Sequence, residues 1–269
     1  MRRLLAAILV MLTALPLWAD ARHTVLMDVL QVRNLSQILQ AEGMQFGATL
    51  NEEWLDGQGG PAWTGQVSRI YDAQRISEGI RAGLEPALEG EMLEEVITFF
   101  ASDLGTRIIT LENSARQALA LEDVEQEARS RFAELQESDN PRLKQISRMI
   151  NAGDLINRNV TSVLNSNYQF LRALVDGDVY VMSDREILED VFSERDAIAA
   201  DTLGWLGAFM LLAYSPLTLE ELTLYADFVK SPAGGALNAG LFAGFDPMYE
   251  DISYALGRAI ALNMAAEEL

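Results

Sequence analysis

One pattern occurs twice in this chain, and the two copies are 129 residues apart with no gap between the aligned positions. The copies share six residues: Leu88, Glu91, Leu93, Phe99, Ser102 and Gly105 recur as Leu217, Glu220, Leu222, Phe228, Ser231 and Gly234. Each copy carries apolar residues at helical spacing and ends in Ser-x-x-Gly, which is typical of an amphipathic helix that stops there. Alignment of residues 72–112 with residues 201–241 gives seven identities in 41 positions. The chain therefore predicts two copies of one helical unit, related by a pseudo-twofold axis.

Helical spacing of apolar residues also dominates the rest of the chain, and strand-like alternation is nearly absent. Residues 179–181 form the only strand-like run, and one short run makes no sheet. We expect helices over about residues 24–50, 64–84, 88–103, 106–121, 122–137, 141–171 with a break near Gly153, and 183–216, from 218 through the second copy of the pattern, and from 247 onward. The predicted fold class is all-α: a helical bundle built from two pseudo-repeated helical units and preceded by a signal peptide.

Short local signals predict several helix ends. Thr64 is a candidate N-cap, and Gly105 is a candidate left-handed residue that ends the first repeat helix. Ser183 and Thr218 each precede a glutamate by three positions, which is the spacing of a capping box. We expect helices of the bundle to begin or end at these positions.

The clearest boundary in the sequence is Asn140 followed by Pro141, since an N-cap and a first-turn proline start a new helix. It divides the mature chain into a first helical unit, residues 22–139, and a second, residues 140–269. Residues 203–214 are apolar nearly all round but too few to span a bilayer, which predicts a helix buried at the centre of the bundle.

The N-terminus has the features of an export signal. Arg2 and Arg3 precede an apolar stretch, Leu4–Leu17, and small residues follow at Ala19 and Ala21. The pattern predicts a signal peptide over residues 1–21 that is cleaved after Ala19 or Ala21, and a mature chain with no transmembrane segment. Since arginine greatly outnumbers lysine, the composition indicates a GC-rich bacterial genome, and hence the periplasm as the compartment.

The composition excludes several classes of function. The formal net charge is −20, so the chain repels nucleic acid and anionic lipid surfaces. There is no cysteine, which removes disulfides, thiol nucleophiles and thiolate metal sites. The only histidine, His23, lies near the predicted new N-terminus, where chains are usually mobile. We therefore expect no zinc site and no Ser-His or Cys-His relay.

The second copy of the pattern begins Leu217-Thr218-Leu-Glu-Glu-Leu and continues through Asp227-Phe228-Val-Lys230-Ser231-Pro232-Ala233-Gly234. It resembles an exported bacterial family known as domain of unknown function 2059, in its Thr/Glu-rich helix start, its aromatic residue before Ser-Pro-x-Gly, and its small-residue helix. The resemblance covers about Leu217 to Met264. A degenerate copy covers about Leu88 to Leu121, where Asp103 replaces the proline. The resemblance implies an all-helical exported protein and brings no known activity, ligand or catalytic residue.

Three groups of acidic residues are candidates for chemistry. The adjacent pairs Glu94–Glu95 and Glu220–Glu221 could act as acid and base in glycoside cleavage, or could be solvated charges at helix starts. Asp72 and Asp201 are equivalent under the repeat and could form a symmetric cation or proton site, or could each lie on a polar helix face. The third group, around a turn, is Asp176, Asp178 and Asp184, which could hold calcium although their spacing does not fit an EF-hand loop.

Aromatic residues could line a ligand pocket, although an aromatic stripe at helical spacing is more often core. The set is Trp54, Trp63, Phe99, Phe100, Trp205 and Phe228. Trp54 and Trp63 flank a Gly-rich loop at residues 57–61. We expect both side chains to be partly exposed and to form a contact surface.

Together these observations favour a non-catalytic periplasmic protein that binds a partner protein or a small apolar ligand between its two halves. The alternative is a carboxylate-based hydrolase acting on cell-envelope sugars, which needs only Asp and Glu. No residue is assigned a catalytic, cofactor-binding or metal-binding role, and no cofactor is expected.

Overall fold

The computed structural model describes residues 21–136 and 138–267. The predicted signal peptide falls on residues 1–20, apart from its last position, and so lies outside the described chain. Every regular element in the described residues is a helix, and no strand occurs among them, so the predicted all-α class is confirmed. Residues 179–181 form part of a loop.

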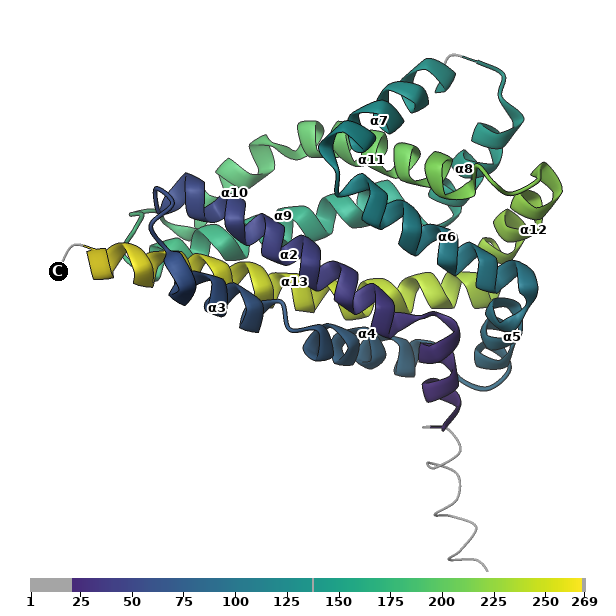
Figure 1. The fold of residues 1–269 in the computed structure, drawn as a ribbon, viewed down its shortest axis with the longest axis horizontal. Coiled ribbons are helices and arrows are strands. Elements are labelled where there is room, and N and C mark those ends of the chain that lie inside the picture. Colours follow the sequence, from purple (N-terminus) through teal and green to yellow (C-terminus); the bar gives the residue numbers. More distant parts are fainter. Residues whose placement is uncertain (1–20, 137, 268–269) are drawn as a thin grey trace, which may run out of the picture.

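Residues 21–29 are helical and precede the labelled helices of Figure 1. The labelled helices are α2 (Val32–Trp54), α3 (Gly60–Ile70), α4 (Ala73–Ala87), α5 (Gly90–Ala101), α6 (Asp103–Leu119), α7 (Glu122–Gln136), α8 (Pro141–Ala152), α9 (Leu155–Val175), α10 (Asp184–Ser193), α11 (Arg195–Tyr214), α12 (Leu219–Val229) and α13 (Pro232–Glu267).

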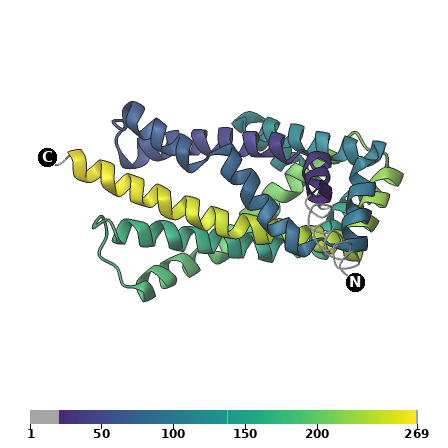
Figure 2. The ribbon, with the colours of Figure 1, turned by 90° about the horizontal axis from the view of Figure 1, so that it is seen from below.

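The longest helix, α13, runs through the middle of the molecule. It packs along α9 on one side and along α4 and α3 on the other, as Figure 2 shows. Its glycines permit these close approaches: a Cβ at Gly244 would lie 2.6 Å from the carbonyl oxygen of Gly79 in α4, and a Cβ at Gly257 would lie 2.6 Å from the carbonyl oxygen of Phe170 in α9. The small residues of α13 therefore set its central position.

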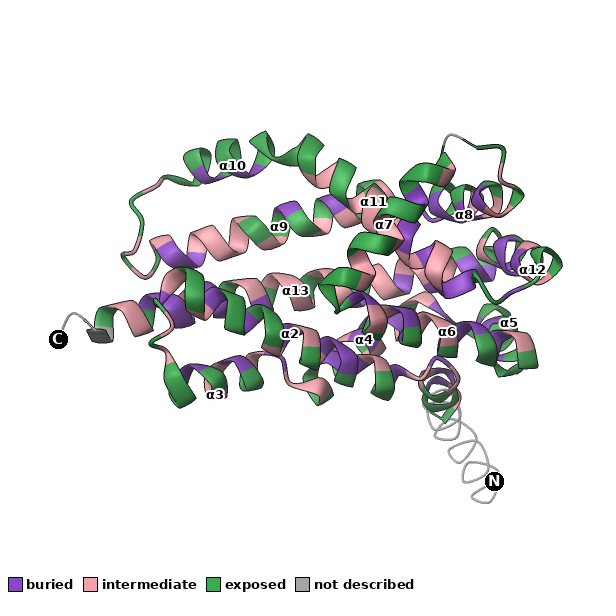
Figure 3. Cartoon of the chain, turned by 45° about the horizontal axis from the view of Figure 1, so that its top comes forward, coloured by how far each residue is buried: buried purple, intermediate pink, exposed green. Residues whose placement is uncertain are grey.

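The principal hydrophobic core draws on both sides of the predicted boundary at residues 139 and 140. Phe100 and Ile108 from the first side pack in the same cluster as Met149 and Leu222 from the second. A second cluster at the other end of α13 includes Trp63. A third, small cluster joins α9 to α10, whose outer face is exposed in Figure 3. The two sequence units thus share one core.

The two copies of the repeated pattern form the same corner between successive helices. Ser102 caps α6 by accepting from the backbone N–H of Gly105 at 3.1 Å, and Ser231 accepts from that of Gly234 at the same distance. Gly105 does not have the predicted left-handed conformation, because it lies in the first turn of α6. A Cβ at either glycine would lie 2.2 Å from a carbonyl oxygen of the preceding helix, so the close approach requires glycine.

Phe99 and Phe228, which occupy equivalent positions, stack on each other with centroids 3.9 Å apart and rings inclined by 10°. The helix order α4, α5, α6 of the first copy matches α11, α12, α13 of the second. The packing is also reciprocal, since α4 packs on α13 and α11 packs on α6.

Three predicted helix ends are confirmed. Asn140 caps α8, with its side-chain oxygen 2.9 Å from the backbone nitrogen of Arg142, and Pro141 is in the first turn. Ser183 and Thr218 both form complete capping boxes. These signals depend only on residues within one helical turn, which is why the sequence carries them.

Other helix ends differ from the prediction. Thr64 lies inside α3, which begins at Gly60, and its hydroxyl donates to the Gly60 carbonyl instead of capping. Asp72 caps α4, so the predicted helix 64–84 is two helices. The first helix is interrupted at Gln31, where φ is 51°, and the region 183–216 is divided at Glu194. In contrast, α13 continues through Pro247 rather than starting there.

The predicted position of the apolar helix is wrong: α13, not α11, is central. Only five residues of α11 are buried, namely Gly207, Ala208, Met210, Ala213 and Tyr214. By length and composition alone, α11 passes the test for a membrane-crossing helix in the described chain, and a third of its apolar stretch is buried. The core helix of a soluble protein can have the same length and composition, so these two properties are weak evidence that α11 crosses a membrane. Most of the other large apolar residues of α11 are half-buried, and only Leu203 among them is exposed.

Candidate functional site

The adjacent glutamate pairs lie at the surface. Glu94 and Glu95 are exposed, and Glu94 accepts two hydrogen bonds from the guanidinium of Arg22. Glu221 completes the capping box of α12 and accepts from both terminal nitrogens of Arg107, at 2.8 and 3.1 Å. Hydrogen bonds from Arg107 and the α12 cap lower the pKa of Glu221 to about 2. An acid catalyst needs a raised pKa, and Glu221 has the opposite.

Asp72 and Asp201 are not brought together as a site. The Asp72 carboxylate accepts from the backbone N–H of Arg75 at 2.9 Å as the α4 N-cap. The Asp201 carboxylate is mostly exposed and pairs with Arg129 at 3.1 Å. Each therefore has a local structural partner of its own.

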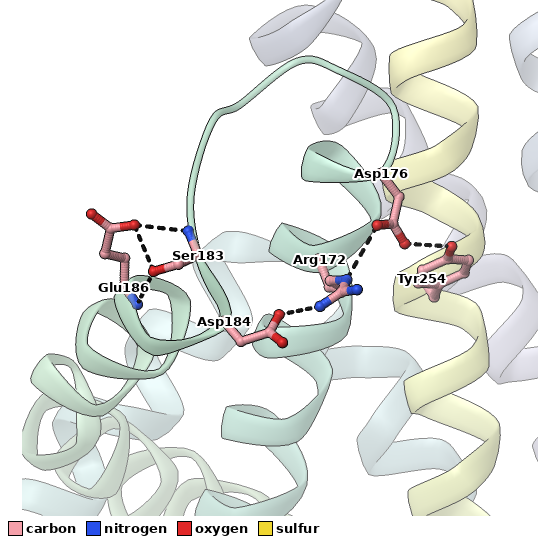
Figure 4. Close-up of polar contacts among 6 residues, drawn as sticks. All are labelled: Arg172, Asp176, Ser183, Asp184, Glu186 and Tyr254. Atoms are coloured by element: carbon pink, nitrogen blue, oxygen red, sulfur yellow. Dashed lines mark hydrogen bonds and ion pairs between the residues drawn. The ribbon is translucent and has the colours of Figure 1, made fainter.

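Two of the three aspartates of the predicted turn, Asp176 and Asp184, lie on either side of an arginine. Figure 4 shows Arg172 between Asp176 and Asp184, with ion pairs to both, while the hydroxyl of Tyr254 donates to Asp176 at 2.9 Å. Asp178 adopts the left-handed conformation, with φ of 61°. The hydrogen bond from Tyr254 and the charge of Arg172 lower the pKa of Asp176. The guanidinium thus supplies the positive charge that calcium would bring, and no cluster of three potential metal ligands occurs in the residues described.

His23 and Trp63 differ from their predictions. His23 is buried, and its Nε2 lies 3.0 Å from the carbonyl oxygen of Leu88 in the principal core. Trp63 is also buried, and its indole N–H donates to the Gly47 carbonyl at 2.8 Å. Of the two tryptophans beside the Gly-rich loop, only Trp54 keeps partial exposure. They do not form the predicted exposed pair.

The remaining predicted aromatics belong to two groups. Phe99, Phe100 and Phe228 form one ring cluster in the principal core. Trp205 of α11 stacks on Phe209 at 5.3 Å, and the guanidinium of Arg116 lies 5.7 Å from its ring centre. Trp205 and Phe209, which form the second group, are half-buried side chains of α11.

A large groove, which we call the interhelical groove, runs between α7, α11 and the start of α8. Its volume is about 710 Å³, within the range of small-molecule sites. The apolar part of its wall consists of Val124, Ala128, Leu135, Ala208, Leu211 and Leu212, and the polar part of Asp123, Glu127, Arg131, Asn140, Arg142 and Ser215. The groove therefore lies at the junction of the two sequence units.

Two contacts hold the walls of the interhelical groove. Phe132, the one buried residue of α7, packs on Gly207, where a Cβ would lie 2.1 Å from the ring. Arg142 donates to the carbonyl oxygens of Tyr214 and Leu217, at 2.7 and 2.8 Å. Arg142 thereby ties the first turn of α8 to the end of α11, where a cation is favourable.

A smaller pocket of about 190 Å³ lies on the opposite side of α11, and we call it the inner pocket. Residues 206, 209, 210 and 214 of α11 line it, whereas residues 208, 211, 212 and 215 line the groove. At 100° per residue these two sets occupy opposite helix faces. Both faces of α11 thus border open space.

The inner pocket contains a carboxylate that sequence reasoning missed. Glu112 of α6 accepts at Oε1 from the hydroxyls of Tyr214 and Tyr225, at 2.7 and 3.0 Å. Burial raises the pKa of the Glu112 carboxyl, and the two tyrosine hydrogen bonds act in the opposite direction. The pKa values of both tyrosines are raised, chiefly by burial. Glu112 lies in a helix that contains both polar and apolar residues, and it belongs to no motif. The sequence therefore carried no signal for its contact with the two tyrosines.

Comparisons of the chain with models of protein families, with curated proteins and with solved structures found no match. The resemblance to the domain of unknown function 2059 stays a prediction, and the functional argument rests on the geometry described above.

Proposed function

We propose that the protein is an exported, non-catalytic binding protein of the periplasm that holds a small apolar ligand in the interhelical groove. The observation that carries this proposal is the incomplete cover of α11, an apolar helix with only five buried residues beside a groove of about 710 Å³. The half-buried side chains of Leu211 and Leu212 line this groove, and an apolar ligand there would remove their remaining surface from water.

The groove suits an apolar occupant better than a charged one. Leu211 and Leu212 stand on the α11 side, and Val124 and Leu135 stand on the α7 side. The charges at the groove are of both signs, and Arg142 already donates to two carbonyl groups. Affinity would therefore come mainly from apolar burial, at about 25 cal/mol per Å² of surface removed from water.

The proposal includes a duplicated chain whose two copies meet around α11. The equivalent Ser–Gly corners, the stacked Phe99 and Phe228, and the reciprocal packing of α4 on α13 and α11 on α6 support it. A junction between two such halves is a common position for a ligand pocket. Cleavage of the predicted signal, the periplasmic location and membership of the domain of unknown function 2059 family are parts of the same proposal.

The alternative, a carboxylate-based hydrolase, has less support. The predicted glutamate pairs are exposed or paired with arginine, and Glu221 has a lowered pKa. The one carboxyl with a raised pKa, among those for which a shift is resolved in the described residues, is Glu112, which stands with two tyrosines rather than a second acid. A glycosidase needs two carboxyl groups on either side of the scissile bond.

The test compares two charged substitutions on α11 in the mature protein. Leu211 lines the interhelical groove, whereas Leu203 is exposed on the same helix and does not line it. Binding of the neutral fluorescent probe N-phenyl-1-naphthylamine is titrated against each variant. We expect Leu211→Glu to weaken binding at least tenfold and Leu203→Glu to leave it within a factor of two. Equal affinities in all three proteins, or equal losses in both variants, would overturn the groove as the site.

A further inference from the structure

The carboxylate of Glu112 faces the inner pocket without a positive partner. Both tyrosine hydrogen bonds go to Oε1, and no ion pair or hydrogen bond in the described chain reaches Oε2. Glu112 keeps partial exposure, and it lines the inner pocket. An ionised carboxylate in such surroundings is unfavourable until a donor or a cation meets it.

Aromatic rings form much of the remaining wall. The pocket is lined by Phe100, Phe209, Tyr214, Tyr225 and Phe228. Tyr214 and Tyr225 meet edge to face, with centroids 5.6 Å apart, and Phe100 meets Phe228 in the same way at 5.5 Å. Such packing turns ring faces in different directions, and the face of an aromatic ring attracts a cation.

The hydrogen-bonding groups of the pocket are mainly acceptors. Each tyrosine hydroxyl already donates its one proton to Glu112. The side-chain amide of Asn238, at the same pocket, donates to the Gly153 carbonyl at 3.0 Å. No arginine or lysine lines the described pocket. A carboxylate or phosphate ligand would meet a like charge and few donors, whereas an N–H donor would meet Oε2.

We propose that the inner pocket binds a compact organic ammonium ion, whose N–H group donates to Oε2 of Glu112 and whose apolar substituent packs among the aromatic and aliphatic side chains. A volume of about 190 Å³ is below the range typical of drug-sized ligands, so the ligand is small. A primary alkylammonium with a branched substituent of a few carbons has the required charge, donor and apolar body.

Binding of a cation also accounts for the tyrosine pair. The two hydroxyls fix Oε1 and so orient the carboxylate with Oε2 toward the pocket, much as outer partners orient a ligand at a metal site. Burial disfavours the charged form of Glu112, and a bound ammonium ion supplies the opposite charge that favours it. The inner pocket and the interhelical groove lie on opposite faces of α11, so this inference is independent of the proposed function.

The experiment uses three probes of similar shape on the unaltered mature protein: isobutylammonium, isobutanol and isobutyrate. Binding of each is measured by isothermal titration calorimetry at constant ionic strength. We expect isobutylammonium to bind at least tenfold more tightly than isobutanol, and isobutyrate not to bind. Isobutanol also has a donor and the same apolar body, so the comparison isolates the charge. Equal binding of the ammonium ion and the alcohol would overturn the proposal.

Glu112→Gln then tests the residue itself. Glutamine keeps the volume and an oxygen that can accept from the tyrosines, but it has no charge. We expect at least a tenfold loss of isobutylammonium affinity with a retained thermal unfolding transition. Glu95→Gln makes the same substitution at an exposed glutamate outside the inner pocket, so it is the matched control and should bind isobutylammonium as the unaltered protein does. Undiminished binding to a folded Glu112→Gln protein would assign the ammonium ion elsewhere and refute the inner pocket. If Glu112→Gln does not fold, the three-probe comparison still decides the charge requirement.

Discussion

Replacement of Gly83 by alanine should separate α4 from α13, the helix at the centre of the molecule. A Cβ at Gly83 would lie 2.2 Å from the nitrogen of Gly244 and 2.4 Å from the carbonyl oxygen of Gly240. Ordinary contact begins at 3.4 Å, so α4 must withdraw by about 1.2 Å. The obstructing atoms are backbone atoms of α13, and no side chain can rotate away to make room.

The expected cost follows from two opposing effects. Overpacking of this kind costs about 1–3 kcal/mol, and a clash with backbone belongs at the upper end of that range. In a helix interior, alanine is also more stable than glycine by about 1 kcal/mol. Withdrawal of α4 loosens Ile80 and Leu84, which are fully buried beside Gly83. We expect a net loss of about 2 kcal/mol in the free energy of unfolding, or about 4–8 °C in Tm for a chain of this size.

Gly79→Ala is a matched control on the same helix, one turn earlier. A Cβ at Gly79 would meet Met248 at 3.6 Å and the carbonyl oxygen of Gly244 at 3.7 Å, which are ordinary contacts. This variant should therefore gain up to about 1 kcal/mol from helix propensity alone. Thermal and urea unfolding followed by circular dichroism would compare the two. A Gly83→Ala protein as stable as Gly79→Ala would refute the close approach of α4 to α13.

Two further predictions concern charged groups. Arg142→Ala should lower the free energy of unfolding by about 1.5–3 kcal/mol, because two hydrogen bonds from a charged donor to backbone carbonyls are lost. Urea titration measures this free energy, and an unchanged unfolding midpoint would contradict the hydrogen bonds from Arg142 to Tyr214 and Leu217. Glu221 has a folded-state pKa of about 2, held down mainly by hydrogen bonds from Arg107 and the Thr218 cap, against an ordinary 4.5. A lowered carboxyl pKa stabilises the fold fully above pH 4.5 and progressively less as pH falls toward 2. The stability difference between the unaltered protein and Glu221→Gln should therefore shrink over that interval, and a difference independent of pH would contradict the ion pair.

The candidate sites show where reasoning from sequence stops. The acidic residues singled out by their spacing, such as Glu94 and Asp201, are satisfied by arginines at the surface. The acid that faces an apolar pocket, Glu112, was not singled out, because its partners Tyr214 and Tyr225 are 102 and 113 residues away. No pattern within one helix records a contact over that separation.

The sequence alone determined the helical class and many helix ends. Apolar spacing of 3.6 residues, the capping boxes at Ser183 and Thr218, and the start at Asn140 and Pro141 all act within one or two turns, so they can be read without a fold. Only the tertiary structure decided which apolar helix is central. Composition favours α11, but the glycines of α13 let other backbones approach within contact distance, and so α13 is central and α11 borders the two pockets. Burial depends on which surfaces fit each other, and that fit is a property of pairs of helices rather than of either sequence by itself.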